Sequence, residues 1–185
     1  TYFSGGCVFD LGRSPKNELH APSHQVAVSR PPLVLDNLPM PEWDIGICIP
    51  LGISHKSEAE EQAFFERTWP LPAEAVYETL YHTIFGLYAA IREADRETFC
   101  RAVRAIQECA WKKAERLEYG ATLIEVERAL YGCGAEAVGM SSLGPTLFFL
   151  ANNVKDTVSQ MQIARPDCEC FLTRPANYGR ELKND

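Results

Sequence analysis

Hydrophobic and polar positions follow two different patterns along this chain. Up to about Pro41, short apolar runs stand between prolines; the runs are Cys7–Phe9, Gln25–Val28 and Leu33–Leu35. Such runs predict strands, and proline restricts them to sheet edges or strand ends. Because these few strands cannot enclose a core, we expect them to complete a sheet whose other strands lie elsewhere.

After Trp43 the spacing becomes helical. A strand is predicted over Ile45–Ile49, and Ser57 with Glu60 has the form of a capping box at the start of a helix. Further on, apolar residues recur every three or four positions, which is the period of one helix face. These residues are Val76, Leu80, Ile84, Leu87 and Ile91.

The rest of the chain alternates helices and strands. Asp95 is expected to cap a helix that runs until Gly120, and a fourth helix should end near Gly132. Next come strands over Ala135–Met140 and Thr146–Leu150, a helix from Asn152 or Asn153 to about Gln162, and a strand over Cys168–Thr173. The order β, helices, β, β, α, β predicts an α+β fold of the ferredoxin-like, split βαβ type. We place this unit at residues 43–185, after a strand-rich segment at 1–42.

Composition excludes some classes of partner. The chain has 18 Lys plus Arg against 25 Asp plus Glu, a net charge of −7, which disfavours generic binding to nucleic acid or to a membrane surface. No apolar run approaches the roughly 20 residues of a membrane helix. The seven cysteines form no C-x-x-C pair, so we interpret them as reduced thiols, mostly buried, of a cytoplasmic protein.

The best candidate for chemistry is the loop from Gly139 to Thr146, which joins two predicted strands. Small residues allow a ligand close to the backbone, and successive amides in a turn can bind an anion. Pro145 directly after Gly144 favours a loop of defined shape. A plain polar hairpin turn is the alternative at this point. The candidate phosphate-binding residues are Gly139, Ser141, Ser142, Gly144, Pro145 and Thr146.

Two weaker candidates flank this region. Asp10 ends a predicted strand, where a carboxylate can coordinate magnesium, and Arg13 nearby can pair with a phosphate. Arg174 and Asn177 follow the last strand and could hold a ligand, although an exposed tail is the simpler interpretation. His82, on the helix after Pro72, is interpreted as a structural residue.

The Gly139–Thr146 run resembles the third motif of the GHMP kinase superfamily. It is most similar to the Gly-x-Ser-Ser-x-Gly-Pro-Thr run of the β-ribofuranosylaminobenzene 5′-phosphate synthase family. Gly5-Gly6 through Asp10, the strand ending in Pro50, and the Thr173–Gly179 segment agree with that family in order and spacing. The chain departs from the family's Gly-Gly-His-Ser after the strand aspartate, since it reads Leu11-Gly12-Arg13-Ser14 there.

This resemblance implies a function. In that family, 4-aminobenzoate or 4-hydroxybenzoate is joined to the ribose of phosphoribosyl pyrophosphate with loss of CO2 and pyrophosphate, in tetrahydromethanopterin biosynthesis. It implies a transferase with Mg2+ as cofactor and Asp10 as metal ligand and catalytic residue. Arg13, Arg174 or the loop would hold the substrate's anionic groups.

The resemblance also implies that the chain is the C-terminal part of an enzyme. Its first 42 residues would then be the end of the superfamily's N-terminal domain, and the main phosphate loop would lie upstream of Thr1. The fragment is expected to be inactive alone, to need that remainder, and to form a homodimer. Two alternatives stay open, an ATP-dependent small-molecule kinase and a non-catalytic regulatory domain that binds a ligand.

Overall fold

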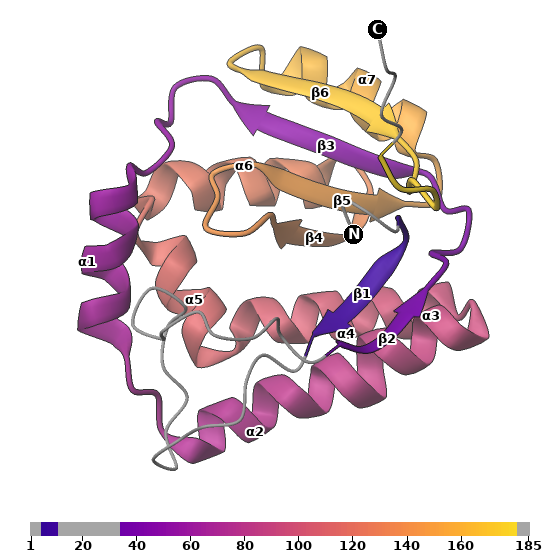
Figure 1. Ribbon diagram of the computed structural model, residues 1–185. Coiled ribbons are helices and arrows are strands. Elements are labelled where there is room, and N and C mark those ends of the chain that lie inside the picture. The colour runs from indigo at the N-terminus through magenta and orange to yellow at the C-terminus, as the bar shows by residue number, and fades with distance from the viewer. Residues whose placement is uncertain (1–4, 11–33, 181–185) are drawn as a thin grey trace, which may run out of the picture.

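The computed structural model describes residues 5–10 and 34–180, and Figure 1 shows how their helices and strands are arranged. The strands are β1 (Cys7–Asp10), β2 (Val34–Leu38), β3 (Ile45–Pro50), β4 (Ala135–Met140), β5 (Leu147–Ala151) and β6 (Cys168–Thr173). The helices are α1 (Glu58–Thr68), α2 (Ala73–Tyr81), the π-helix η2 (His82–Tyr88), α3 (Ala89–Glu93), α4 (Arg96–Glu108), α5 (Ala110–Leu117), α6 (Gly120–Gly132) and α7 (Val154–Ala164).

The larger sheet has the strand order β4-β5-β3-β6, and every neighbouring pair is antiparallel. This is the order that a split βαβ unit produces, so the expected α+β fold is confirmed. A smaller antiparallel sheet pairs β1 with β2 and lies in front of α4 (Figure 1). The expected strand at Gln25–Val28 falls outside the described residues, and the proposed domain boundary at residue 43 stays a prediction.

The two faces of the larger sheet enter different cores. Val138 and Met140 of β4 pack with the buried side chains of α6 and α7, whereas Ala137, the residue before Val138, joins Phe9, Phe99 and Leu150 on the other side. The alternation follows from the strand period of two. The sheet is therefore covered by α6 and α7 on one face and by α3, α4 and β1 on the other.

Three helices begin at the N-cap residues that the sequence predicts. The Ser57 hydroxyl accepts from the Glu60 amide while the Glu60 carboxylate accepts from the Ser57 amide at 2.8 Å, which is the expected capping box. Asp95 accepts from the Thr98 amide at 3.0 Å, and Asn153 caps α7. These short polar side chains satisfy amides that would otherwise lack partners in the first turn.

Two helix predictions were wrong in detail. The expected single helical face from Val76 to Ile91 is interrupted by η2, whose wider turn rotates the side chains, and Leu80 is 46% exposed. The helix expected to run to Gly120 ends at Glu108, because Cys109 adopts an extended conformation and a new helix, α5, starts after it. Ala110, the first residue of α5, is exposed.

All seven cysteines lie in the described residues and none forms a disulfide; five are buried and two are half-buried, as expected. In the part of the chain that the structure describes, no helix is long and apolar enough to cross a bilayer.

Candidate functional site

The β4–β5 loop closes on its own backbone. The Ser141 amide donates to the Thr146 carbonyl at 2.9 Å, and the Gly144 amide donates to the Ser141 carbonyl at 2.8 Å. Ser142 and Gly144 have positive φ angles of 49° and 80°, and the Gly144–Pro145 peptide is cis. Within the described residues, the amides of Ser142 and Leu143 donate to no other group. The loop is thus a defined turn that leaves two adjacent N–H groups for a ligand.

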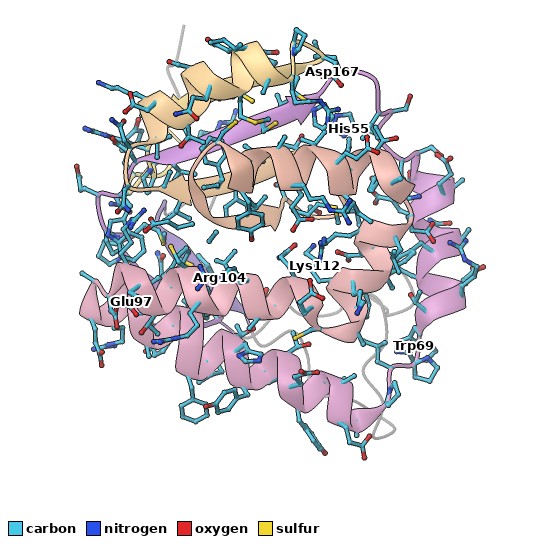
Figure 2. All side chains as sticks on the ribbon, turned by 180° about the vertical axis from the view of Figure 1, so that it is seen from behind. His55, Trp69, Glu97, Arg104, Lys112 and Asp167 are labelled. Carbon is cyan, nitrogen blue, oxygen red and sulfur yellow. The ribbon has the colours of Figure 1, made fainter. Side chains whose placement is uncertain are left out.

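Side chains from α5 and from the turn that precedes α6 hold the loop's carbonyl groups. The Tyr119 hydroxyl donates to the Leu143 carbonyl at 2.5 Å, and the Lys112 ammonium on α5 (labelled in Figure 2) donates to the Ser142 carbonyl. The Lys56 ammonium lies 5.2 Å from the centre of the Tyr119 ring. The loop is therefore held through two of its carbonyl groups by a tyrosine and a lysine, and a second lysine lies against the tyrosine ring.

Carboxylates balance these cations. Buried Glu115 accepts from Lys112 at 2.5 Å and from the Trp111 indole, while Glu118 accepts from Arg67 at 2.8 Å and Lys56 at 3.2 Å. Burial acts to raise the pKa of Glu118, but the hydrogen bonds from Arg67 and Lys56 outweigh it and hold that pKa below its ordinary value.

The same surroundings shift the pKa of Tyr119, the aromatic residue of this cluster. Burial, and then the nearby carboxylates, raise the pKa of Tyr119. Its hydroxyl therefore stays protonated and continues to donate to the loop.

Both glycines of the predicted motif have steric reasons to be glycine. A Cβ atom on Gly139 would lie 2.3 Å from the Phe148 ring, and one on Gly144 would lie 2.6 Å from the Met140 sulfur. Gly144 also has the positive φ that glycine adopts at no steric cost. These contacts explain the glycines through packing alone, and their role in phosphate binding stays a prediction.

The predicted residues at the C-terminal segment lie at the other end of the sheet. Strand β3 shows the separation. The β4–β5 loop ends next to Leu147, which pairs with Cys48 near one end of β3, whereas Thr173 pairs with Ile45 at the other end. Arg174 pairs with Asp44 at 2.8 Å, and Asn177 exchanges two 2.8 Å hydrogen bonds with the backbone of Met40. The structure therefore does not bring Arg174 and Asn177 to the loop.

A shallow cavity of about 590 Å³ opens at that far end. Arg174, Arg96 and Lys155 line it together with Glu42 and Asp44. Arg174 is bonded to Asp44 and Arg96 to Glu136, so the two arginines here already have carboxylate partners.

The remaining predicted residues belong to neither group. Asp10 is exposed at the end of β1 in the smaller sheet, where the register with β2 shifts. Arg13 lies outside the described residues. Sequence reasoning overlooked Lys56, Lys112 and Tyr119. No motif marks these three, because they come from the β3–α1 connection, α5 and the start of α6 and meet only in the folded chain.

Similarity to curated proteins covers nearly the whole chain. It is 28% identical over 186 aligned positions to a β-ribofuranosylphenol 5′-phosphate synthase from Archaeoglobus fulgidus, covering 97% of this chain and 57% of that protein. The protein of the same name from Methanothermobacter thermautotrophicus is 27% identical, with 86% of this chain and 49% of that protein covered. The chain spans about half the length of these relatives. No protein-family model matches the sequence.

Solved structures with the same fold are small-molecule kinases. Homoserine kinase from Cytophaga hutchinsonii superposes with a TM-score of 0.62 at 15% identity, over 80% of this chain and 46% of that one. Mevalonate kinase from L. major gives 0.58 at 12% identity, over 82% and 47%. The expected resemblance to the GHMP kinase superfamily is confirmed. At these identities the superpositions establish the fold alone, that of the GHMP C-terminal α+β domain.

Proposed function

We propose that this chain is the C-terminal portion of a synthase that joins the ribose 5-phosphate of phosphoribosyl pyrophosphate to 4-hydroxybenzoate. The observation that carries the proposal is the similarity to two β-ribofuranosylphenol 5′-phosphate synthases over most of the chain, including the Gly139–Thr146 loop. The phenol in that name favours 4-hydroxybenzoate over 4-aminobenzoate, the other substrate that the resemblance implied. Tetrahydromethanopterin biosynthesis is the pathway proposed with it.

The proposed reaction is balanced without an oxidant. The ring carbon that carries the carboxylate forms a bond to C1 of the ribose, and the C1–oxygen bond to pyrophosphate breaks. The ring–carboxylate bond then breaks, CO2 leaves, and its electron pair restores the aromatic ring. Charge develops on the leaving pyrophosphate, so the protein's part is to place positive groups and N–H donors around it.

The β4–β5 loop has the groups for this task. The amides of Ser142 and Leu143, which have no partner among the described residues, would donate to a phosphate or pyrophosphate oxygen, and Lys56, against the Tyr119 ring, would add positive charge to the region. Tyr119 fixes the Leu143 carbonyl and so keeps the two amides in place. In a site that excludes water such donors stabilise developing charge more than water does.

The described residues beside the loop do not fit a magnesium site. Magnesium prefers carboxylate and phosphate oxygens, but Glu115 and Glu118 are bonded to Lys112, Lys56 and Arg67. Asp10 lies in the smaller sheet, and its role as a metal ligand stays a prediction.

The test is an assay of the intact protein with phosphoribosyl pyrophosphate and 4-hydroxybenzoate, in which released CO2 and pyrophosphate are measured together. Replacing Lys56 by Met should raise the KM for phosphoribosyl pyrophosphate about tenfold, because one charge-assisted contact is lost. Ser159→Ala on α7, whose hydroxyl bonds only to its own helix, is the matched control. An unchanged KM in Lys56→Met would remove this cluster from the substrate site.

A kinase is the second candidate, favoured by the fold shared with homoserine and mevalonate kinases. The same protein would then hydrolyse or transfer the γ-phosphate of ATP and release no CO2. Binding of phosphoribosyl pyrophosphate without turnover of either kind would support the regulatory domain instead.

A further inference from the structure

A mixed cluster of possible metal ligands lies where α2 and η2 meet the junction of α4 and α5. A carboxylate oxygen of Glu78, an imidazole nitrogen of His82 and the Cys109 sulfur all lie within 4.8 Å of one another. Glu78 is exposed, His82 is half-buried and Cys109 is only 1% exposed. The cluster thus reaches from the surface into the protein, and solvent can reach its outer ligand.

The fold brings these residues together through close helix packing. Helix η2 lies against α4 in an antiparallel arrangement, visible as the α2–η2–α3 rod beneath α4 in Figure 1. Gly86 permits the approach, since a Cβ there would be 2.6 Å from the Ala102 methyl group. Thr79 lies seven residues before Gly86, and Cys109 lies seven residues after Ala102. Each is about two turns from the contact between the two helices. Glu78 and His82 are four residues apart, so they lie on the same side of their helix, next to Thr79.

Local structure also fixes two of the three ligands. Cys109 is the extended residue between α4 and α5, and its thiol donates to the Ala105 carbonyl at 3.5 Å. The Tyr81 ring meets the His82 ring edge-on, with centroids 5.3 Å apart. Each of these two side chains therefore has a local contact that restrains it without a ligand.

Two carboxylates lie near the Cys109 thiol. They are Glu78, within the cluster, and Glu108, the preceding residue. Glu108 is bonded to Arg116 and Lys113, whereas Glu78 forms no ion pair within the described residues. A bound dication would neutralise this carboxylate and stabilise the thiolate form of Cys109 at the same time.

We propose that Glu78, His82 and Cys109 form a site for one zinc-class divalent cation, with a fourth position open to water or to another ligand. One sulfur, one nitrogen and one oxygen ligand suit zinc or cobalt, and they do not suit magnesium or calcium, which take oxygen alone. The cation would connect α2 and η2 to the α4–α5 junction. It requires small side-chain adjustments to bring the ligands to coordination distance.

Cobalt(II) binding to the intact, metal-stripped protein tests the proposal, because the spectrum reports the ligands. Wild type should bind one cobalt per chain in this site, with the visible bands of tetrahedral cobalt and a thiolate-to-cobalt charge-transfer band. His82→Gln should weaken cobalt affinity about 100-fold, and Glu78→Gln about tenfold, as expected for lost ligands. Zinc should displace cobalt and raise the unfolding temperature of wild type more than that of His82→Gln.

Matched controls separate the cluster from the other thiols and histidines. Cys100→Ala removes a buried cysteine of α4 outside the cluster, and His55→Gln removes a histidine of the β3–α1 connection. Both should bind cobalt as wild type does.

Three outcomes would overturn the site. They are the absence of the charge-transfer band, equal affinities in wild type and His82→Gln, and an equal loss in Cys100→Ala. In those cases Glu78 and His82 are only neighbouring polar residues on a helix. Because Glu78 is exposed, Glu78→Gln keeps the experiment decisive even if His82→Gln folds poorly.

Discussion

The two ends of the four-stranded sheet carry similar candidate residues but use them differently. At the β4–β5 end, the loop bonds to itself and to Tyr119 and Lys112, and two amides are left without partners in the described chain. At the opposite end, after the last residue of β6, Asn177 hydrogen-bonds to the backbone of Met40 and Arg174 pairs with Asp44. Polar residues around a glycine are therefore candidates for ligand binding only where the folded protein leaves their hydrogen-bond donors without partners.

The largest expected effect is at Gly144. Gly144→Ala should lower the free energy of unfolding by about 3 kcal/mol, since it adds left-handed backbone strain to a clash with Met140 and Tyr119. Urea unfolding measures the effect. Gly120→Ala is the matched control, because Gly120 has a similar positive φ of 63° but open space around it, and it should cost about 1 kcal/mol. Equal losses in both variants would mean that the loop is not tightly packed.

The next effect concerns Asn177. Asn177→Ala removes two hydrogen bonds to the Met40 backbone and should lower the free energy of unfolding by about 1–2 kcal/mol. Arg174→Ala breaks only an exposed ion pair and should cost about 0.5 kcal/mol or less. A larger loss in Arg174→Ala than in Asn177→Ala would contradict the structural role assigned to Asn177.

Tyr119→Phe sharpens the comparison at the loop end. Losing the hydrogen bond to the Leu143 carbonyl should cost about 1 kcal/mol of stability. Because the loop would then be held less firmly, affinity of the intact protein for phosphoribosyl pyrophosphate should fall severalfold, as calorimetry can measure. Unchanged affinity together with lower stability would limit Tyr119 to a purely structural role.

The smallest effect is a pH dependence at Glu118. Its pKa is lower in the folded protein than in the unfolded chain, so its contribution is present above the unfolded value of about 4.3 and is lost as pH falls through the folded value. Wild type should therefore exceed Glu118→Gln in stability at pH 7 by less than about 1 kcal/mol, and the two should converge in acid or in high salt. A difference that persists in acid would contradict this origin.

Local signals in the sequence determined much of the fold. Capping by Ser57, Asp95 and Asn153 and the bounds of β4 and β6 follow from side chains that act within a few residues, so they could be predicted. The loop motif was also visible, because glycine and proline restrict the backbone wherever they occur.

Only the tertiary structure decided which residues meet. No local pattern marks the break at Cys109 or the π-helix that begins at His82. The same holds for Lys56, Lys112 and Tyr119 at the loop, for the separation of Arg174 and Asn177 from it, and for the cluster of Glu78, His82 and Cys109. Contacts between distant segments arise from the packing of whole helices and strands, whereas sequence spacing describes neighbours along one element alone.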